Sequence, residues 1–243
     1  GVCKCYSNVI LVLNSGGIID LGFKDCYPSI KAVIQMGQCG MESGNAFADV
    51  VSGKVTFGGH LTDTWAFRYE DYPNATTFSY MDGNVHKEYY KEGIYVGYRY
   101  YDTKQMEVAY PFGYGLSYTD FEQKMGDVTV ADGKVSFDVT VTNNGTAAGK
   151  DVVEVYYNPP YTNGGIEKAS ANLIDFAKTD VLQPGESQTI TVSFAEEDMA
   201  SYDTYGNGCY VLEAGDYEIS INADSHNAIE SKTVSVADTV VYD

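Results

Sequence analysis

The amino-acid sequence predicts an α/β portion followed by an all-β sandwich. Before residue 88, continuous apolar runs alternate with glycine-rich turns and one helical pattern, which is typical of parallel strands and their connecting helices. After residue 121, short segments of alternating apolar and polar residues are separated by turns, which is typical of a sandwich of antiparallel strands. The sequence therefore predicts two domains of different class.

The charge of the chain limits its partners. The 243 residues include 34 acidic and 15 basic side chains, for a formal net charge of -19. Such a charge repels nucleic acid and anionic membrane surfaces, so we expect neither as a partner and expect a neutral or cationic ligand. No apolar run approaches the roughly 18 residues of a membrane span, and no targeting segment is visible at Gly1.

The first portion contains the elements of one βαβ unit. Buried parallel strands are predicted at Asn8–Leu13 and Ala32–Ile34, with a short helix at Ile18–Phe23 between them. Gly40–Gly53 predicts a helix that Gly53 ends, and Leu61–Phe67 predicts a further strand. One βαβ unit cannot make a stable open sheet, because parallel strands need cover on both faces and neighbours at both edges. We therefore expect the chain to be a piece of a larger protein.

The segment of residues 88–121 connects the two domains and is rich in tyrosine and glycine. Its glycines, at positions 93, 97, 113 and 115, suit neither a long helix nor a regular strand. Glycine lets a backbone turn or approach another chain closely, and tyrosine rings bury area while keeping a hydroxyl for hydrogen bonding. We expect an irregular connection packed by aromatic rings, and name it the connecting segment.

Period-two alternation marks the strands that follow. The clearest examples are 135–141, 190–194 and 217–221, and residues 152–157 add a further strand. Residues 158–165 form a polar excursion between strands. Short, spaced strands of this kind predict a β-sandwich.

Several motifs resemble one known family. Glu92–Asp102 (EGIYVGYRYYD) and Tyr110–Thr119 (YPFGYGLSYT) resemble the signature of glycoside hydrolase family 3, where it joins an α/β sandwich domain to a fibronectin type III-like domain. Val141–Tyr157 and Leu182–Gln188 are similar to that fibronectin-like domain. The resemblance implies a partial α/β sandwich domain at 1–87, the connecting segment at 88–121 and a fibronectin type III-like β-sandwich at 122–243.

The resemblance also implies an activity for the complete protein. Members of the family include retaining exo-β-glycosidases, and the most similar activity is β-glucosidase, which hydrolyses terminal β-D-glucosyl residues. In such enzymes the nucleophilic aspartate lies on a TIM barrel and the acid/base glutamate lies upstream of the strand that matches Asn8–Leu13. The chain is therefore expected to hold no catalytic residue and to be inactive alone. A β-glucoside or oligosaccharide substrate, the missing barrel as a covalent or separate partner, a possible homo-oligomer, no metal and no organic cofactor are also implied.

Three residues are candidates for lining a substrate site. Glu42 lies at a glycine-rich turn before a helix, where α/β sheets commonly bind ligands, although a role at the helix N-terminus is the more common one for an acid. Tyr98 and Arg99 belong to a tyrosine cluster that either lines a sugar subsite or packs between domains, and packing is favoured. Arg99 and Asp102 are expected to pair with each other or with neighbouring domains, and a fixed structural ion pair is favoured over a substrate clamp. The other tyrosines of this cluster are Tyr89, Tyr90, Tyr95, Tyr100 and Tyr101.

Two rival classes remain open on sequence alone. A carbohydrate-binding module and a structural β-sandwich protein both fit an acidic, tyrosine-rich chain, but neither explains half of a parallel sheet. The five cysteines are scattered and odd in number, so we expect free thiols and neither a disulfide framework nor a metal site. The sequence does not identify a compartment, and bacterial cytoplasmic and secreted locations both stay open.

Overall fold

A computed structural model describes residues 1–242, without the side chain of Tyr80. The chain divides into two compact units. The first unit comprises Gly1–Val55 and Trp65–Tyr89, and the second comprises Thr56–Thr64 and Tyr90–Asp243. The predicted boundaries at 87/88 and 121/122 stay predictions, and the structure groups residues 56–64 with the second unit. None of the helices in the described part of the chain has the length and apolar character needed to cross a membrane.

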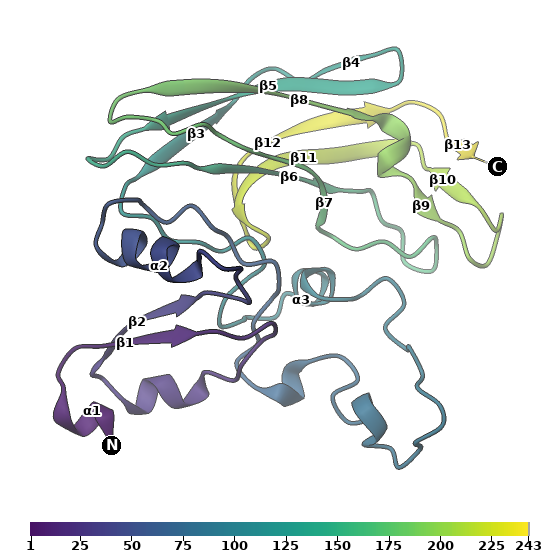
Figure 1. Cartoon of the computed structure of the whole chain (residues 1–243). Coiled ribbons are helices and arrows are strands. Elements are labelled where there is room, and N and C mark those ends of the chain that lie inside the picture. The colour runs from purple at the N-terminus through teal and green to yellow at the C-terminus, as the bar shows by residue number, and fades with distance from the viewer. Residues whose placement is uncertain (243) are drawn as a thin grey trace. The chain divides into compact units, whose positions relative to one another are not determined.

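The first unit is built on a pair of parallel strands (Figure 1). β1 (Val9–Leu13) and β2 (Ile30–Gln35) are confirmed as parallel strands. Their predicted burial is wrong, because only Leu13 of β1 and no residue of β2 is buried. The helical turn between them is a 3₁₀ helix at Gly22–Cys26, four residues later than predicted at its start. The side chain of Asp20 explains this shift, because its carboxylate accepts a hydrogen bond from the Gly22 amide at 2.7 Å and so starts the turn there.

Short helices complete the first unit. The predicted helix is confirmed as α2 (Ser43–Val51), which ends at Ser52 before Gly53, whose φ of 75° is easily adopted only by glycine. The remaining elements are α1 (Val2–Cys5) and the 3₁₀ helices Tyr69–Asp71 and Phe78–Tyr80.

The strand predicted at Leu61–Phe67 is wrong. The backbone of Leu61 instead forms hydrogen bonds with a segment of the same unit that is distant in sequence. Its amide donates to the Tyr114 carbonyl at 2.9 Å. Its carbonyl accepts from the Gly113 amide at 2.8 Å. Partial alternation of apolar residues was the only sequence signal, and two backbone bonds to the connecting segment replace the ladder that a strand would need.

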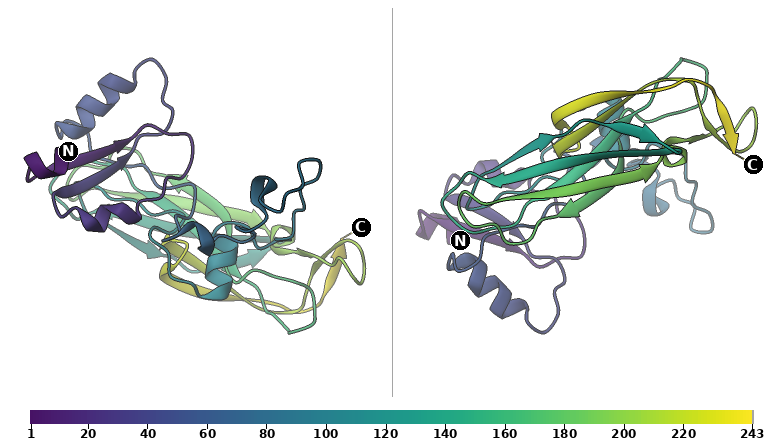
Figure 2. Two further views of the ribbon diagram at one scale, coloured as in Figure 1. Left: turned by 90° about the horizontal axis from the view of Figure 1, so that it is seen from below. Right: turned by 90° about the horizontal axis from the view of Figure 1, so that it is seen from above.

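The second unit is a β-sandwich, as predicted (Figures 1 and 2). One sheet has the order β12-β11-β6-β7, and in the other β5 pairs with β3 and β4 along one edge and with β8 along the other. A small sheet of order β13-β10-β9 follows. The connecting segment contributes α3 (Tyr98–Lys104), and the 3₁₀ helix Glu196–Met199 follows β8. The strands are β3 (Phe121–Met125), β4 (Thr129–Ala131), β5 (Lys134–Asn143), β6 (Val152–Asn158), β7 (Asn172–Lys178), β8 (Ser187–Ala195), β9 (Ser201–Tyr202), β10 (Tyr210–Leu212), β11 (Gly215–Asp224), β12 (Asn227–Val236) and β13 (Val240–Tyr242).

The core of the sandwich follows from the alternation in the sequence. Apolar side chains of β5 and β11 that occupy every second position are almost fully buried and belong to one cluster. These residues are Val135, Phe137, Val139, Val141, Tyr217, Ile219 and Ile221. The polar residues between them on β5 face outward, where Thr140 and Thr142 form hydrogen bonds with Thr189 and Ser187 of β8.

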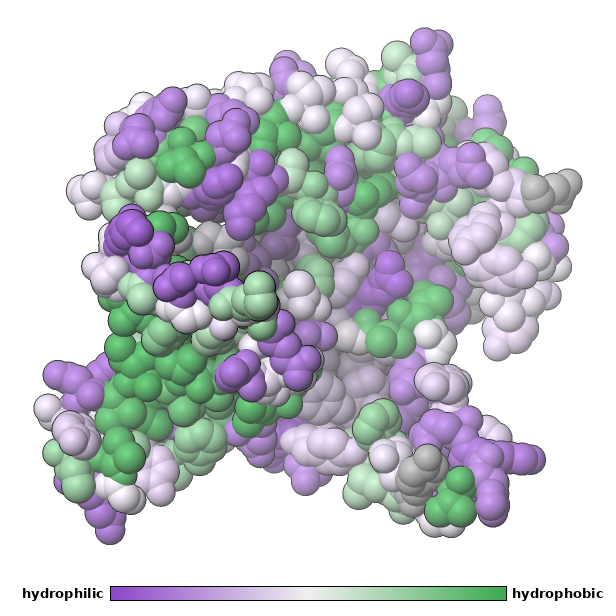
Figure 3. All heavy atoms as spheres, in the orientation of Figure 1, coloured by the Kyte–Doolittle hydropathy of each residue, from purple (hydrophilic) through white to green (hydrophobic). Residues whose placement is uncertain are grey.

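The two-stranded sheet of the first unit is not covered in the same way. Ile10 and Val12 of β1 are 52% and 37% exposed, and only Leu13 of that strand is buried. Further large apolar side chains of this unit are also exposed, including Ile18, Ile19 and Phe23. Figure 3 shows apolar surface gathered over β1 and β2. The first unit therefore presents apolar surface of the kind that proteins usually bury.

The packing of the sandwich core yields a test. We predict that Ile219→Ala lowers the free energy of unfolding by about 2–5 kcal/mol, because the deleted methyl groups leave a cavity in a filled core. Ile229→Ala is the matched control, since Ile229 of the paired strand β12 is 42% exposed, and it should cost less than about 1 kcal/mol. Urea unfolding followed by circular dichroism measures both, and equal losses would contradict the assigned core.

Candidate functional site

Glu42 lies where the sequence placed it, at the beginning of a helix. It is the residue before α2, and its backbone carbonyl accepts from the Ala46 amide at 3.0 Å. The side chain makes no capping bond to the helix backbone, and its Oε2 instead accepts from the Asn45 amide group at 2.5 Å. The carboxylate is exposed, so it is chemically available to a ligand. No side-chain hydrogen bond caps the beginning of α2.

Tyr98 and Arg99 lie together at the beginning of α3. This helix is held in place by side chains at both ends, since the Tyr98 hydroxyl accepts from the Leu173 amide at 2.9 Å. The Thr103 hydroxyl accepts from the Ser170 amide at 3.0 Å. Both acceptor contacts reach the stretch that leads into β7, so α3 is fixed to the sandwich of its own unit.

The ring of Tyr98 packs against two other aromatic rings. The ring centres of Tyr98 and Phe112 are 4.8 Å apart, and Tyr156 of β6 meets Tyr98 edge-on at 5.9 Å. The Arg99 guanidinium lies 5.9 Å from the centre of the same Tyr98 ring, a cation–π distance. Both the ring and the hydroxyl of Tyr98 therefore already contact other residues of the protein, as expected of a residue with a packing role.

An ion pair between Arg99 and Asp102 is absent from the described residues. The carboxylate of Asp102 is 8% exposed, and its Oδ1 lies 2.6 Å from Nδ1 of His226. The two helix residues are three positions apart, but Arg99 extends over the Tyr98 ring while Asp102 faces the sandwich. Asp102 therefore pairs with His226 of its own unit and not with Arg99. The pairing of Arg99 with a neighbouring domain stays a prediction.

His226 joins the turn between β11 and β12 to the connecting segment. Its Nδ1 faces the Asp102 carboxylate, and its Nε2 lies 3.1 Å from the Met106 carbonyl oxygen. Both neighbours accept hydrogen bonds, so the ring satisfies both when it carries two protons. The hydrogen bond to Asp102 raises the pKa of His226 above its ordinary value of 6.5, while partial burial opposes this rise. The structure therefore favours an imidazolium at this position.

The other tyrosines of the predicted cluster do not converge on one point. Tyr101 is 1% exposed and packs edge-on against Tyr100, with ring centres 5.3 Å apart. The Tyr95 hydroxyl donates to Glu167 Oε2. By contrast, Tyr90 is 92% exposed, and Tyr89, which belongs to the other unit, is also exposed. The cluster is thus a mixture of packed and exposed rings.

A buried carboxyl group that was not singled out from the sequence lies on β6. Glu154 is 5% exposed, and burial raises its pKa to about 7. Its Oε2 accepts a hydrogen bond from the Tyr156 hydroxyl at 2.8 Å. Gly113, with a φ of 84°, lies directly against this carboxyl group, and a Cβ at that position would overlap it. A glycine is needed there both for the backbone conformation and for space.

A signal for Glu154 was present in the sequence. It is the one charged residue of the strand VVEVYY, and Tyr156 follows it on the same face at a spacing of two. Val153 and Val155 face the sandwich core, so Glu154 and Tyr156 must face the other side of the sheet. The partner of Asp102 could not be found in this way, because 124 positions separate His226 from it and no local pattern links them.

No metal centre is found in the part of the chain that the structure describes. Residues 1–242 hold no group of three or more histidine, cysteine, aspartate or glutamate side chains placed to bind an ion. The five cysteines are free, as the sequence analysis expected.

Two families of known domains match the chain. The family described as Glycosyl hydrolase family 3 C-terminal domain matches residues 1–98, and the family described as Fibronectin type III-like domain matches residues 151–225. Beta-glucosidase A of Butyrivibrio fibrisolvens is 42% identical over 87% of this chain and 28% of its own length.

Solved structures agree with these matches. The beta-glucosidase of Kluyveromyces marxianus in complex with glucose has a TM-score of 0.90 and 32% identity, over 99% of this chain and 28% of that one. Beta-glucosidase 3B of Thermotoga neapolitana in complex with glucose has a TM-score of 0.86 and 38% identity, over 97% of this chain and 32% of that one. The chain thus spans less than a third of the length of each of these three relatives.

The ion pair between Asp102 and His226 predicts a pH dependence. Because the folded pKa of His226 is raised, the pair contributes stability that is fully present below pH 6.5 and is lost as the pH rises through the folded pKa. We predict that His226→Gln lowers the free energy of unfolding most at low pH, and that its difference from the native protein shrinks as the pH rises. Urea unfolding across pH 5–9 measures this, with exposed His86→Gln as the control. A difference that grows with pH would contradict the pair.

The burial of Glu154 also predicts a stability that falls as the pH rises. Its folded pKa of about 7 exceeds the ordinary value of 4.5, so its neutral form stabilises the fold below pH 4.5 and this contribution is lost as the pH rises through 7. We predict that Glu154→Gln is more stable than the native protein above pH 7, because the amide carries no charge into the buried site. Thermal unfolding at pH 5 and pH 8 tests this. Exposed Glu107→Gln is the control, and a loss of stability at pH 8 in Glu154→Gln alone would overturn the assignment.

Proposed function

Because this chain belongs to glycoside hydrolase family 3, with that family's C-terminal domain followed by a fibronectin type III-like domain, we propose that it forms part of a retaining exo-β-glycosidase. The proposed reaction is hydrolysis of terminal, non-reducing β-D-glucosyl residues. Relatives named β-glucosidase, and neighbouring structures with bound glucose, support a glucoside as the substrate.

The single observation that carries this proposal is the uncovered pair of parallel strands. Ile10 and Val12 of β1 are exposed in a unit whose sheet has only two strands. Parallel sheets in proteins are covered on both faces, and a two-stranded sheet has too few strands to be stable alone. The chain spans less than a third of the length of its relatives. In such a protein the remaining two thirds can cover the exposed faces of β1 and β2.

The proposed chemistry needs groups outside this chain. A retaining glycosidase uses a carboxylate nucleophile and a second carboxyl group as acid/base, about 5–5.5 Å apart across the sugar. The buried carboxyl groups described above are committed within the second unit, Asp102 to His226 and Glu154 to Tyr156. We therefore assign both catalytic groups to other parts of the enzyme, with the nucleophile on a TIM barrel.

The chain has a supporting role in this proposal. Glu42, Tyr98 and Arg99 remain the proposed substrate-lining residues. Of these, Glu42 has an exposed carboxylate that can accept from a sugar hydroxyl in addition to its bond from Asn45. Tyr98 and Arg99 shape the connecting segment through the contacts of α3. A barrel of the same enzyme, on the same or on a second polypeptide, is the proposed partner of the apolar surface on the first unit, and a homo-oligomer stays a prediction.

The proposal predicts that the 243-residue chain alone does not hydrolyse an aryl β-glucoside. A polypeptide that also contains the barrel should release the aryl group and give a β-configured sugar as its first product, because two displacements at the anomeric carbon retain configuration. Release of the chromophore measures the rate, and proton NMR of the anomeric signals identifies the first product.

Two results would contradict this proposal. One is turnover by the 243-residue chain that is abolished by Glu42→Gln, because the chain would then carry its own catalytic carboxylate. The other is an α-configured first product from the longer polypeptide, because that product requires a single displacement. Asp49→Asn, a change of an acid on the same helix α2, is the matched control for Glu42→Gln.

A further inference from the structure

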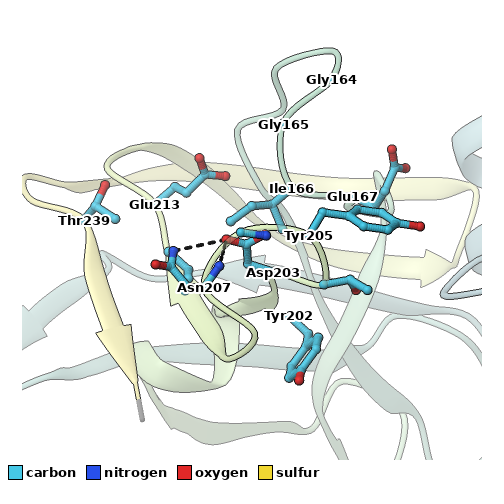
Figure 4. Close-up of a pocket in the computed structure, with 13 residues that line it drawn as sticks. Gly164, Gly165, Ile166, Glu167, Tyr202, Asp203, Tyr205, Asn207, Glu213 and Thr239 are labelled. Atoms are coloured by element: carbon cyan, nitrogen blue, oxygen red, sulfur yellow. Dashed lines mark hydrogen bonds between the residues drawn. The ribbon is translucent and has the colours of Figure 1, made fainter.

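A cavity of about 430 Å³ lies at one end of the sandwich, entirely within the second unit (Figure 4). Two loops form most of its wall: residues 164–167, which precede β7, and residues 202–207, between β9 and β10. Val211, Glu213 and Thr239 complete it, and Figure 4 shows Thr239 at one end and Tyr205 beside Glu167 at the other. The volume falls within the range of small-molecule sites, roughly 300–1,000 Å³.

Internal hydrogen bonds define the conformation of the loop between β9 and β10. Asp203 accepts hydrogen bonds from the backbone amides of Gly206 at 2.9 Å and Asn207 at 2.7 Å. The Tyr202 hydroxyl donates to the Gly208 carbonyl at 2.7 Å. A Cβ at Gly206 would overlap the Asp203 carboxylate, so this tight turn needs glycine. A preformed loop loses little entropy when it binds a ligand.

Three carboxylates around the cavity are held in place, and two of them, Glu167 and Glu213, keep capacity to accept further hydrogen bonds. Lys168 has a side chain that is 2% exposed, and its Nζ lies 2.5 Å from Glu213 Oε2 and 2.7 Å from the Pro160 carbonyl. Glu167 accepts from the Tyr95 hydroxyl. An ionised carboxylate offers about four acceptor positions, so Glu167 and Glu213 can accept further hydrogen bonds. Asp203 already accepts from the amides of Gly206 and Asn207, from the Asn207 side chain and from the backbone of Tyr205, and is filled. Hydrogen bonds from the Asn207 and Gly206 amides lower the pKa of Asp203, which keeps it ionised.

The ring of Tyr205 is exposed at the edge of this cavity. Tyr205 is 95% exposed on the loop between β9 and β10, although burial of a tyrosine ring is favourable. Tyr202 points away from the other lining residues. Its ring packs edge-on against Tyr210, with ring centres 5.3 Å apart, and this contact joins the two ends of the loop. The ring of Tyr205 is thus a flat apolar face held next to hydrogen-bond acceptors.

The chemistry of the lining excludes two kinds of ligand. Three carboxylates repel an anion, and only one of them is neutralised by Lys168. A bound metal ion is not supported either, because residues 1–242 contain no group of three acidic, histidine or cysteine side chains close enough to hold one. These exclusions leave neutral and cationic organic molecules, and of these a molecule with several hydroxyl groups and an apolar face matches both the acceptors and the ring of Tyr205.

We propose that this cavity binds a neutral saccharide, with the sugar ring against Tyr205 and its hydroxyl groups donating to Glu167 and Glu213. Binding at this place is a property of the sandwich itself and needs no catalytic group. It goes beyond the proposed hydrolysis and would stand if that proposal failed. Its role is to hold a saccharide chain on the fibronectin-like domain.

Calorimetric titration of the full 243-residue chain with cellobiose tests the proposal. We expect saturable binding and a dissociation constant that Tyr205→Ala raises about tenfold or more, since the stacking surface is removed. Tyr205→Phe keeps the ring and should stay within about threefold of the native value. Tyr205 is so exposed that neither change should disturb folding, and the thermal midpoint of each variant checks this.

Tyr90→Ala is the matched control, because Tyr90 is equally exposed, at 92%, and is not among the residues that line the cavity. Binding that survives Tyr90→Ala and falls in Tyr205→Ala supports the proposal. No binding by the native chain overturns it, and so does binding that Tyr90→Ala abolishes and Tyr205→Ala preserves. Sorbitol, a polyol without a ring, should bind much more weakly, and equal affinity for sorbitol would also overturn the proposal. Hydrolytic activity is measured in none of these experiments, so the outcome is independent of the catalytic proposal.

Discussion

The apolar faces of the β1–β2 pair place the strongest constraint on this chain. Two parallel strands have no further neighbours within the unit, and Ile10 and Val12 remain exposed on the first of them. Apolar surface exposed to water lowers the stability of a fold by roughly 25 cal/mol per Å² that could have been buried. In the proposed glycosidase, the part of the enzyme outside these 243 residues covers this surface and supplies the catalytic carboxylates.

The sandwich differs from the first unit, because the apolar faces of its two sheets are buried against each other. Apolar residues of β5 and β11 reach 0% exposure in one continuous cluster. The connecting segment is tied to the other face of the β6 sheet through buried polar groups, in which Asp102 meets His226 and Gly113 lies against Glu154. Buried polar groups are tolerated only when their partners are fixed, so this segment has a defined conformation where its glycine spacing alone suggests a loose one.

The sequence was a good guide where a local period decides structure. The alternation of apolar and polar residues predicted β5, β8 and β11, and the continuous apolar run at residues 8–13 predicted β1. These strands were predictable because their patterns involve residues that are neighbours in the sequence. It failed at Leu61–Phe67, whose backbone bonds go to residues about 50 positions later. For the candidate site, the position of Glu42 before a helix was predictable from its glycine-rich surroundings, whereas the His226 partner of Asp102 and the cavity beside Tyr205 depend on tertiary contacts that no local pattern encodes.

Amide hydrogen exchange tests the central claim most directly. The measurement compares the 243-residue chain alone with the longer polypeptide that includes the proposed barrel, strand by strand. The account predicts that amides of β1 and β2 exchange fast in the chain alone and become protected in the longer protein, while β5 and β11 are protected in both. Strong and equal protection of β1 and β2 in both samples would contradict it, because the first unit would then need no cover from outside this chain.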